Sequence, residues 1–146
     1  MEENKIVYVN CNRMGSIPGT PWWPVKELSG GQIVEQTIHN FDIVRYLVGE
    51  PDTVFTFAQQ GDVKNYPDTP ANYNTDDVTT TVVKFKNGTL ASLTTGCYVT
   101  TGEAYDSNFT FSAKDKRCEL RILSRLDIYG ESAEKKDEAE KSGFVI

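Results

Sequence analysis

The sequence predicts an α+β domain in which one main helix packs on one face of a β-sheet of five to seven strands. Three observations predict this class: a β-type run over residues 5–11, a helix with marked ends over residues 29–51, and alternating apolar and polar residues from Thr53 onward. Many of the later segments carry threonine or other small polar residues on one side and valine, phenylalanine or leucine on the other. Such strands bury one face against a helix and present the other to solvent or to a second subunit.

The composition indicates one globular domain, residues 1–146, that binds neither nucleic acid nor membrane. A chain of 146 residues can bury roughly two thirds of the surface that its unfolded form exposes. Its 15 Lys+Arg against 21 Asp+Glu give a net charge of −6, and no basic stripe is present to neutralise phosphates. No apolar run approaches the ~18 residues of a bilayer span, and the first residues lack the pattern of a signal peptide, so we expect a cytoplasmic protein.

The cysteines predict thiols rather than a disulfide framework or a metal site. Cys11, Cys97 and Cys118 are odd in number and share no C-x-x-C spacing. Both facts favour buried or free thiols in a reducing compartment, so we expect no zinc.

The first segments of the chain are a strand and a long loop. Residues 5–11, KIVYVNC, form a strand that begins almost at the first residue, which suggests a piece of a longer protein. Residues 12–29 are rich in Gly and Pro and predict an ordered loop. Its two tryptophans, Trp22 and Trp23, need a surface to cover.

Residues 29–51 predict the main helix. Ser29 can accept a hydrogen bond from the amide of Gln32 while the Gln32 side chain reaches back, and Gly49 followed by Pro51 gives the usual end. At 100° per residue, an apolar stripe that faces the core is formed by Ile33, Val34, Thr37, Phe41, Val44 and Val48. A polar ridge on the opposite side is formed by Glu35, His39, Asp42 and Tyr46.

The polar ridge carries the only histidine of the chain. His39 can interact with Glu35 or Asp42, and either carboxylate would raise the pKa of the imidazole so that it donates a proton near neutrality. The alternative is an exposed ion pair without a chemical role. The tandem glycines at 30–31 and the tryptophans upstream suit the approach of a sugar or nucleotide edge, although both also have a plain packing explanation.

The second half of the chain predicts the sheet. Asn87-Gly88 is suited to a type I′ hairpin turn between two of its strands. The connection over residues 61–77 is long, hence either a lid or a mobile surface excursion. The predicted strands are residues 53–59, 78–85, 89–99, 109–113 and 118–122, with 125–130 as a possible further strand.

The segment WWPVKELSGGQIVEQTIHNFDIVRYLVGEP resembles the substrate domain of the Gfo/Idh/MocA oxidoreductases. These typically show a Trp, then L-S-G-G, an acidic residue, three residues, His, two residues, Asp, and a W/Y-L-x-G ending. The resemblance continues through TDDVTTTVVKFKNGTLASLTTGCY and through the opening KIVYVNCNR, so it spans roughly residues 5–130. Order and spacing together make it specific.

The resemblance implies a C-terminal α+β domain built on an open, largely antiparallel mixed sheet. Members of the family place an N-terminal Rossmann domain that holds NAD or NADP before this domain. The present sequence contains no G-x-G-x-x-G and no E-K-P lysine motif. The cofactor site and the catalytic lysine would therefore lie outside it, and we expect no cofactor to bind to this chain alone.

The resemblance also implies roles for individual residues. Glu35 and His39 would be catalytic, with His39 accepting or relaying the hydroxyl proton and Glu35 orienting the imidazole or a substrate hydroxyl. Asp42 would fix the ring tautomer or make an ordinary structural contact. Residues expected to contact the substrate are Trp22, Trp23, Lys26 and Asn40.

Together these features predict the substrate-binding half of an NAD(P)-dependent oxidoreductase acting on a sugar, cyclitol or related polyol. The isolated domain would be inactive. Expected partners are its own Rossmann domain and a second copy, as a homodimer or higher homo-oligomer through the sheet face. The alternative is a non-catalytic binding or oligomerisation module that uses this face, with the polar ridge only solvated.

Overall fold

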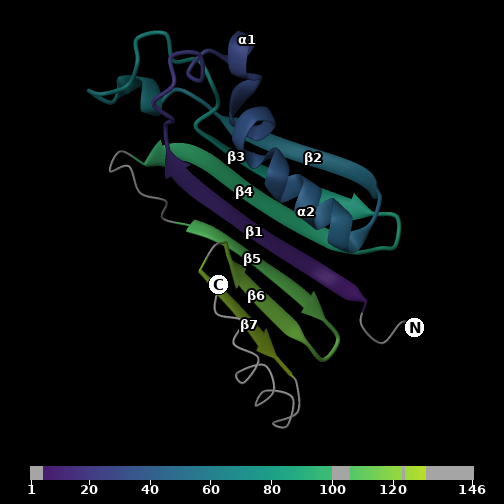
Figure 1. The fold of residues 1–146 in the computed structure, drawn as a ribbon. Helices are drawn as coiled ribbons and strands as arrows, with labels where there is room; N and C mark the ends of the chain where they lie inside the picture. Colours follow the sequence, from purple (N-terminus) through teal and green to yellow (C-terminus); the bar gives the residue numbers. More distant parts are fainter. Residues whose placement is uncertain (1–4, 100–105, 123, 131–146) are drawn as a thin grey trace.

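The computed structural model of the chain describes residues 5–99, 106–122 and 124–130. A seven-stranded sheet in the order β2-β3-β4-β1-β5-β6-β7 carries the main helix on one face (Figure 1). The strands are β1 (Ile6–Ser16), β2 (Pro51–Gln59), β3 (Val78–Phe85), β4 (Leu90–Val99), β5 (Asp106–Ala113), β6 (Arg117–Arg121) and β7 (Arg125–Tyr129). The helical segments are α1 (Lys26–Ser29), a π-helical turn (Ile33–Thr37), α2 (Ile38–Val48) and a 3-10 turn (Val63–Asn65).

The predicted α+β class and the largely antiparallel mixed sheet are confirmed. Only β1 and β4 pair in parallel among the described strands, and the other neighbouring strands are antiparallel. The first strand is longer than expected and lies at the centre of the sheet, where Cys11 sits opposite Leu93 of β4 and Phe109 of β5. Among the described residues, no helix has the length and apolar character that crossing a bilayer requires.

The hairpin between β3 and β4 forms where expected, but its turn differs from the predicted type. Gly88 donates its amide to the carbonyl of Phe85 at 2.9 Å, so Lys86 and Asn87 are the central residues of the turn. Gly88 then follows them with φ 87°. This is the three-residue hairpin loop with a glycine in the left-handed region, rather than a two-residue Asn-Gly turn.

The main core lies between the sheet and α2. Val44 and Val48 of α2 are buried against alternate residues of four strands, which is the burial pattern of a half-covered sheet. These residues are Val9, Cys11, Val83, Phe85, Ala91, Leu93, Phe109 and Phe111. Threonines are not confined to the outer face, however, because Thr79 and Thr81 of β3 are buried on the same side as Val83.

The start of the helix corrects the predicted capping box. Gly30 (φ 77°) ends α1 and Gly31 (φ 84°) continues in the left-handed region, so the chain changes direction before the next turn begins. Ser29 Oγ accepts the amide of Gly31 at 3.0 Å instead of that of Gln32. The Gln32 side chain enters the sheet, where Nε2 donates to Thr79 Oγ1 at 2.9 Å and to Thr95 Oγ1 at 3.0 Å. The tandem glycines thus serve a backbone reversal that other residues rarely adopt.

The π-helical turn shifts which residues face the core. Because this turn holds one residue more than an α-helical turn, positions counted at 100° per residue fall out of step across it. Thr37 is buried as predicted, whereas Val34 is 56% exposed, so its predicted place in the apolar stripe is wrong. Asn40 is buried beside Val44 in its place.

The loop over residues 60–77 is anchored at its end by one carboxylate. Asp77 Oδ2 accepts the amides of Gly61, Asp62 and Val63 at 2.9, 2.8 and 3.2 Å. Asp77 is only 1% exposed, and the amides that it accepts from would otherwise be left without partners. Tyr73, from the same loop, packs with Val63 in a second core cluster.

Replacing Asp77 by alanine should therefore lower the free energy of unfolding by about 3 kcal/mol, since one buried and two partly buried amides would lose a charged acceptor. Urea unfolding followed by circular dichroism measures the change. The matched control is Asp76→Ala, which removes only a partly exposed ion pair with Lys26 and should change the free energy by less than about 1 kcal/mol. Equal effects of the two substitutions would contradict the anchoring role.

Candidate functional site

The site is built from Trp23, which is fully buried, and Glu35, which is partly exposed. Trp23 packs in the second core cluster with Val63, Tyr73 and Cys97. Its indole Nε1 donates a hydrogen bond of 2.8 Å to Glu35 Oε2. The carboxylate is therefore oriented by a fully buried side chain, while part of its surface stays open to solvent.

His39 lies four residues after Glu35, at the start of α2, and is exposed. Asp42 and Tyr46 are exposed as well, so the predicted polar ridge is present on the side of the helix away from the core. The ring of His39 is accessible to a ligand or to another domain. Neither of the two grooves described below includes it.

The four residues expected to contact substrate divide into two pairs. Trp22 is 43% exposed, and Lys26 is exposed with its Nζ 3.0 Å from Asp76 Oδ2, so both can reach a ligand. Trp23 is fully buried, and Asn40 is 3% exposed with its Nδ2 donating to Cys11 Sγ at 3.2 Å. The burial of Trp23 and Asn40 leaves no surface for a substrate, because Trp23 is enclosed by the second core cluster and Asn40 faces β1.

A row of polar contacts beneath the helix was not predicted from the sequence. Arg13 Nη1 donates to Cys97 Sγ at 3.4 Å, and Cys97 Sγ donates to Gln36 Oε1 at 3.5 Å. The signal was present in the sequence: had the first strand been extended to Ser16, alternation would have placed Arg13 on the same face as Cys11. Gln36 follows Glu35 directly, so this row ends beside the carboxylate that Trp23 holds.

The thiols at the base of the site are neutral. Burial raises the pKa of Cys97 to about 11, with Arg13 opposing and Glu35 adding to the effect. Burial likewise raises the pKa of Cys11 to about 11, opposed by the hydrogen bond from Asn40. The described residues contain no group of three or more His, Cys, Asp or Glu arranged to hold a metal ion.

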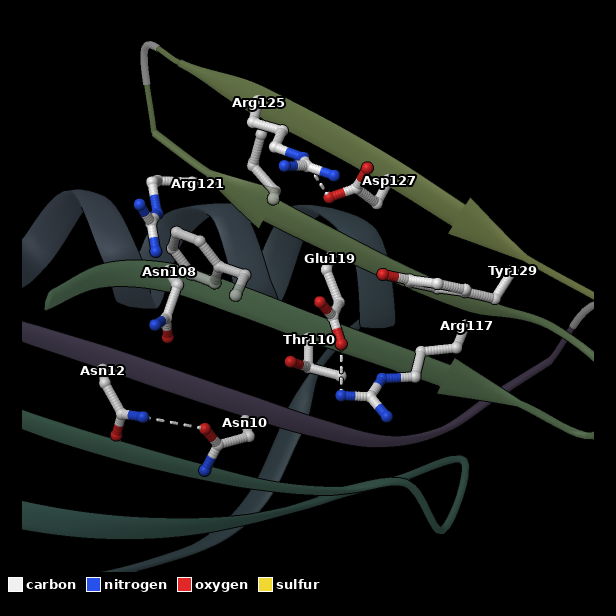
Figure 2. Close-up of a pocket in the computed structure, with 12 residues that line it drawn as sticks. Asn10, Asn12, Asn108, Thr110, Arg117, Glu119, Arg121, Arg125, Asp127 and Tyr129 are labelled. Atoms are coloured by element: carbon white, nitrogen blue, oxygen red, sulfur yellow. Dashed lines mark hydrogen bonds and ion pairs between the residues drawn. The ribbon is translucent and has the colours of Figure 1, made fainter. Parts of the chain in front are cut away.

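The opposite face of the sheet carries a polar groove of about 510 Å³ over β1, β5, β6 and β7 (Figure 2). In the register of β6 and β7, Arg121 lies opposite Arg125, and Glu119 lies opposite Asp127. Like charges placed opposite one another repel. The repulsion is relieved along each strand, where Arg117 pairs with Glu119 and Arg125 pairs with Asp127. The groove thus carries a positive row, Arg121 with Arg125, beside a negative row, Glu119 with Asp127.

The β2 edge of the same face carries exposed apolar side chains. Phe55 and Phe57 of β2 are 58% and 71% exposed, and their rings meet edge to face with centroids 4.8 Å apart. Val82 of β3 lies opposite Phe55 and is also exposed. A smaller apolar groove of about 110 Å³ lies on the helix side, between α2 and β2.

The sequence matches the family model of the GFO/IDH/MocA C-terminal domain over residues 4–133. This range covers most of the chain and contains every element described above. The chain belongs to the Gfo/Idh/MocA C-terminal domain family. The predicted resemblance to the family is thereby confirmed.

Solved structures share the fold of this Gfo/Idh/MocA domain. UDP-N-acetylglucosamine 3-dehydrogenase GnnA from Acidithiobacillus ferrooxidans matches with a TM-score of 0.66 and 20% identity, over 88% of this chain and 37% of that chain. Levoglucosan dehydrogenase in complex with NADH and levoglucosan matches with a TM-score of 0.71 and 19% identity, over 90% and 37%. The WlbA dehydrogenase from Bordetella pertussis in complex with NADH and UDP-GlcNAcA matches with a TM-score of 0.69 and 15% identity, over 90% and 40%.

These matches establish the fold. The chain spans about two fifths of the length of each of these proteins. A comparison with curated protein sequences gives no match.

The thiol environments predict the order in which the cysteines react. A pKa of about 11 in place of the usual 9.0 lowers the thiolate fraction at pH 8 about 100-fold, since each pKa unit is a factor of ten. Cys118 is less buried, so it should react first with Ellman's reagent, and Cys11 and Cys97 only after unfolding in urea. Cys118→Ser should remove the first phase. A fast phase that survives this substitution would contradict the assignment.

Proposed function

We propose that this Gfo/Idh/MocA domain is the substrate-binding half of an NAD(P)-dependent oxidoreductase acting on a sugar, cyclitol or related polyol. The single observation that carries the proposal is Glu35, held by Trp23 at 2.8 Å one helical turn before the exposed His39. The family and the sugar dehydrogenases among its structural neighbours support it.

The proposed chemistry assigns the proton to this chain. His39 accepts the proton of the substrate hydroxyl as the alcohol is oxidised, and Glu35 orients the ring or a neighbouring hydroxyl. Trp22 offers an aromatic face to the sugar, and Lys26 offers a donor beside it. Trp23 and Asn40 act as positioning residues beneath the site.

The cofactor belongs to another domain in this proposal. The sequence contains no G-x-G-x-x-G, so this chain's own residues do not form a dinucleotide cradle. Nicotinamide, when bound by an N-terminal Rossmann domain, supplies the hydride acceptor. The protein's own N-terminal Rossmann domain is therefore the first expected partner.

In the intact enzyme, His39→Ala should lower kcat by about 100-fold or more, while the affinity for NAD(H) stays near normal, because a general acid/base is lost. Steady-state kinetics and cofactor titration measure both quantities. Tyr46→Ala is the matched control, since Tyr46 lies on the same polar ridge and is 87% exposed. Unchanged turnover in His39→Ala would overturn the catalytic assignment.

The chain by itself should neither bind NADH appreciably nor oxidise a polyol, because it supplies only one wall of the site. Isothermal titration calorimetry of residues 1–146 with NADH measures this directly. Micromolar affinity would place a dinucleotide site in this chain and contradict the proposed division between domains.

The second candidate function is a non-catalytic oligomerisation module, which the sheet face favours. Its exposed Phe55 and Phe57 offer apolar surface. The charged groove lies toward the opposite edge of this face, on β6 and β7. Its positive and negative rows are self-complementary, because a two-fold axis between the rows places each against its opposite. A homodimer or higher homo-oligomer through this face is part of both candidates. Replacement of His39 distinguishes the two candidate functions, because it should not change the association of a module without catalysis.

A further inference from the structure

Arg13 is held in place beneath the proposed site by its surroundings on β1. Its guanidinium donates to Cys97 Sγ at 3.4 Å. Gly15 lies two residues further along the same face of β1. Its lack of a side chain makes room for the guanidinium, because a Cβ there would lie 3.1 Å from Arg13 Nη1. The side chain is half-buried, so its orientation is restricted by packing and not only by solvent.

The charge of Arg13 has no carboxylate within 4.0 Å among the described residues. Several exposed basic side chains do have such a partner: Lys26 pairs with Asp76, Arg45 with Glu50, and Arg125 with Asp127. Lys84 and Arg121 have none among the described residues, but both are exposed to solvent, whereas Arg13 is half-buried. Cys97 does not neutralise Arg13 either, because its pKa of about 11 keeps the thiol protonated at neutral pH. Removing a guanidinium partly from water without a counter-charge costs free energy, and a bound anion would offset that cost.

The position of Arg13 relates this open charge to Glu35. Cys97 lies between them: it contacts Arg13 on one side and Gln36 on the other, and it packs against Trp23, which holds Glu35. Both Arg13 and Glu35 act on the Cys97 thiol through their charges. Cys97 thus connects Arg13 with the residues that surround the Glu35 carboxylate.

We propose that Arg13 binds an anionic group of the sugar substrate, a carboxylate or a phosphate, and so determines the specificity of the Glu35 and His39 site. This inference rests on the proposed function and deepens it. Guanidinium forms paired, parallel hydrogen bonds with both kinds of anion, which a lysine cannot reproduce. Lys26 is less suited to this role, because Asp76 already compensates its charge.

The test compares matched sugars on the intact enzyme: glucose as the neutral sugar, glucuronate for a carboxylate, and glucose 6-phosphate and UDP-N-acetylglucosamine for phosphates. Arg13→Met should lower kcat/KM for the preferred anionic sugar tenfold to a hundredfold and change that for glucose less than twofold. Arg13→Lys should restore only part of the loss. Arg45→Met is the control, because it removes an arginine that is ion-paired with Glu50 at an exposed position.

The outcomes separate this inference from the proposed function. Equal losses on neutral and anionic sugars, or no loss, would assign Arg13 to packing or to contact with another domain and overturn the inference. Calorimetric binding of the same sugars provides a readout that does not depend on turnover. Weaker anion binding in Arg13→Met together with unchanged turnover in His39→Ala would retain Arg13 and overturn the catalytic pair. Failure of every anionic sugar to bind the wild-type enzyme would overturn the inference as well.

Discussion

The hydrogen bond from Trp23 to Glu35 is the interaction on which the rest of the site depends. It joins a fully buried indole to a carboxylate at the surface. The indole is fixed because the loop over residues 60–77 folds back and packs Val63 and Tyr73 around it. That loop is in turn fixed by the three amides that Asp77 accepts from. A partly exposed acid is thus positioned by a chain of contacts that begins at Asp77, directly before β3, and this chain gives the Glu35 carboxylate a defined geometry.

The helix that carries the site is attached to the sheet by polar contacts at its start and apolar contacts at its end. Gln32 reaches Thr79 and Thr95, and Asn40 reaches Cys11. After Asn40, the helix contacts the sheet through the apolar side chains of Val44 and Val48. Buried polar side chains must be paired, so they allow fewer alternative positions of the helix than apolar packing would. The start of the helix, which carries Glu35 and His39, is therefore the half that hydrogen bonds hold to the sheet.

The sequence was sufficient to predict the sheet, because alternation over 78–85 and 89–99 is strong and the Asn87-Gly88 pair marks the hairpin. It was also sufficient to predict that His39 faces away from the core, since the apolar residues after it follow a regular helix. It failed at Gln32 and Val34. A pair of left-handed glycines and a π-helical turn change direction and periodicity there, and neither leaves a mark in the hydrophobic pattern. Arg13 was missed for another reason: the predicted first strand ended at Cys11, and the contacts of Arg13 with Cys97 join residues that are far apart in the sequence.

The two faces of the sheet place different demands on the same strands. On the helix side, β1 contributes Cys11 and Arg13 to the contacts beneath the helix. The residues that precede each of them, Asn10 and Asn12, line the groove on the opposite side. Because side chains alternate along a strand, a change of register by one residue would exchange these two sets. β1 is held against such a change by pairing with β4 on one edge and β5 on the other over nearly its whole length. The central strand therefore keeps two sets of side chains apart, with Cys11 and Arg13 on the helix side and Asn10 and Asn12 on the groove side, and its pairing on both edges fixes which set each face receives.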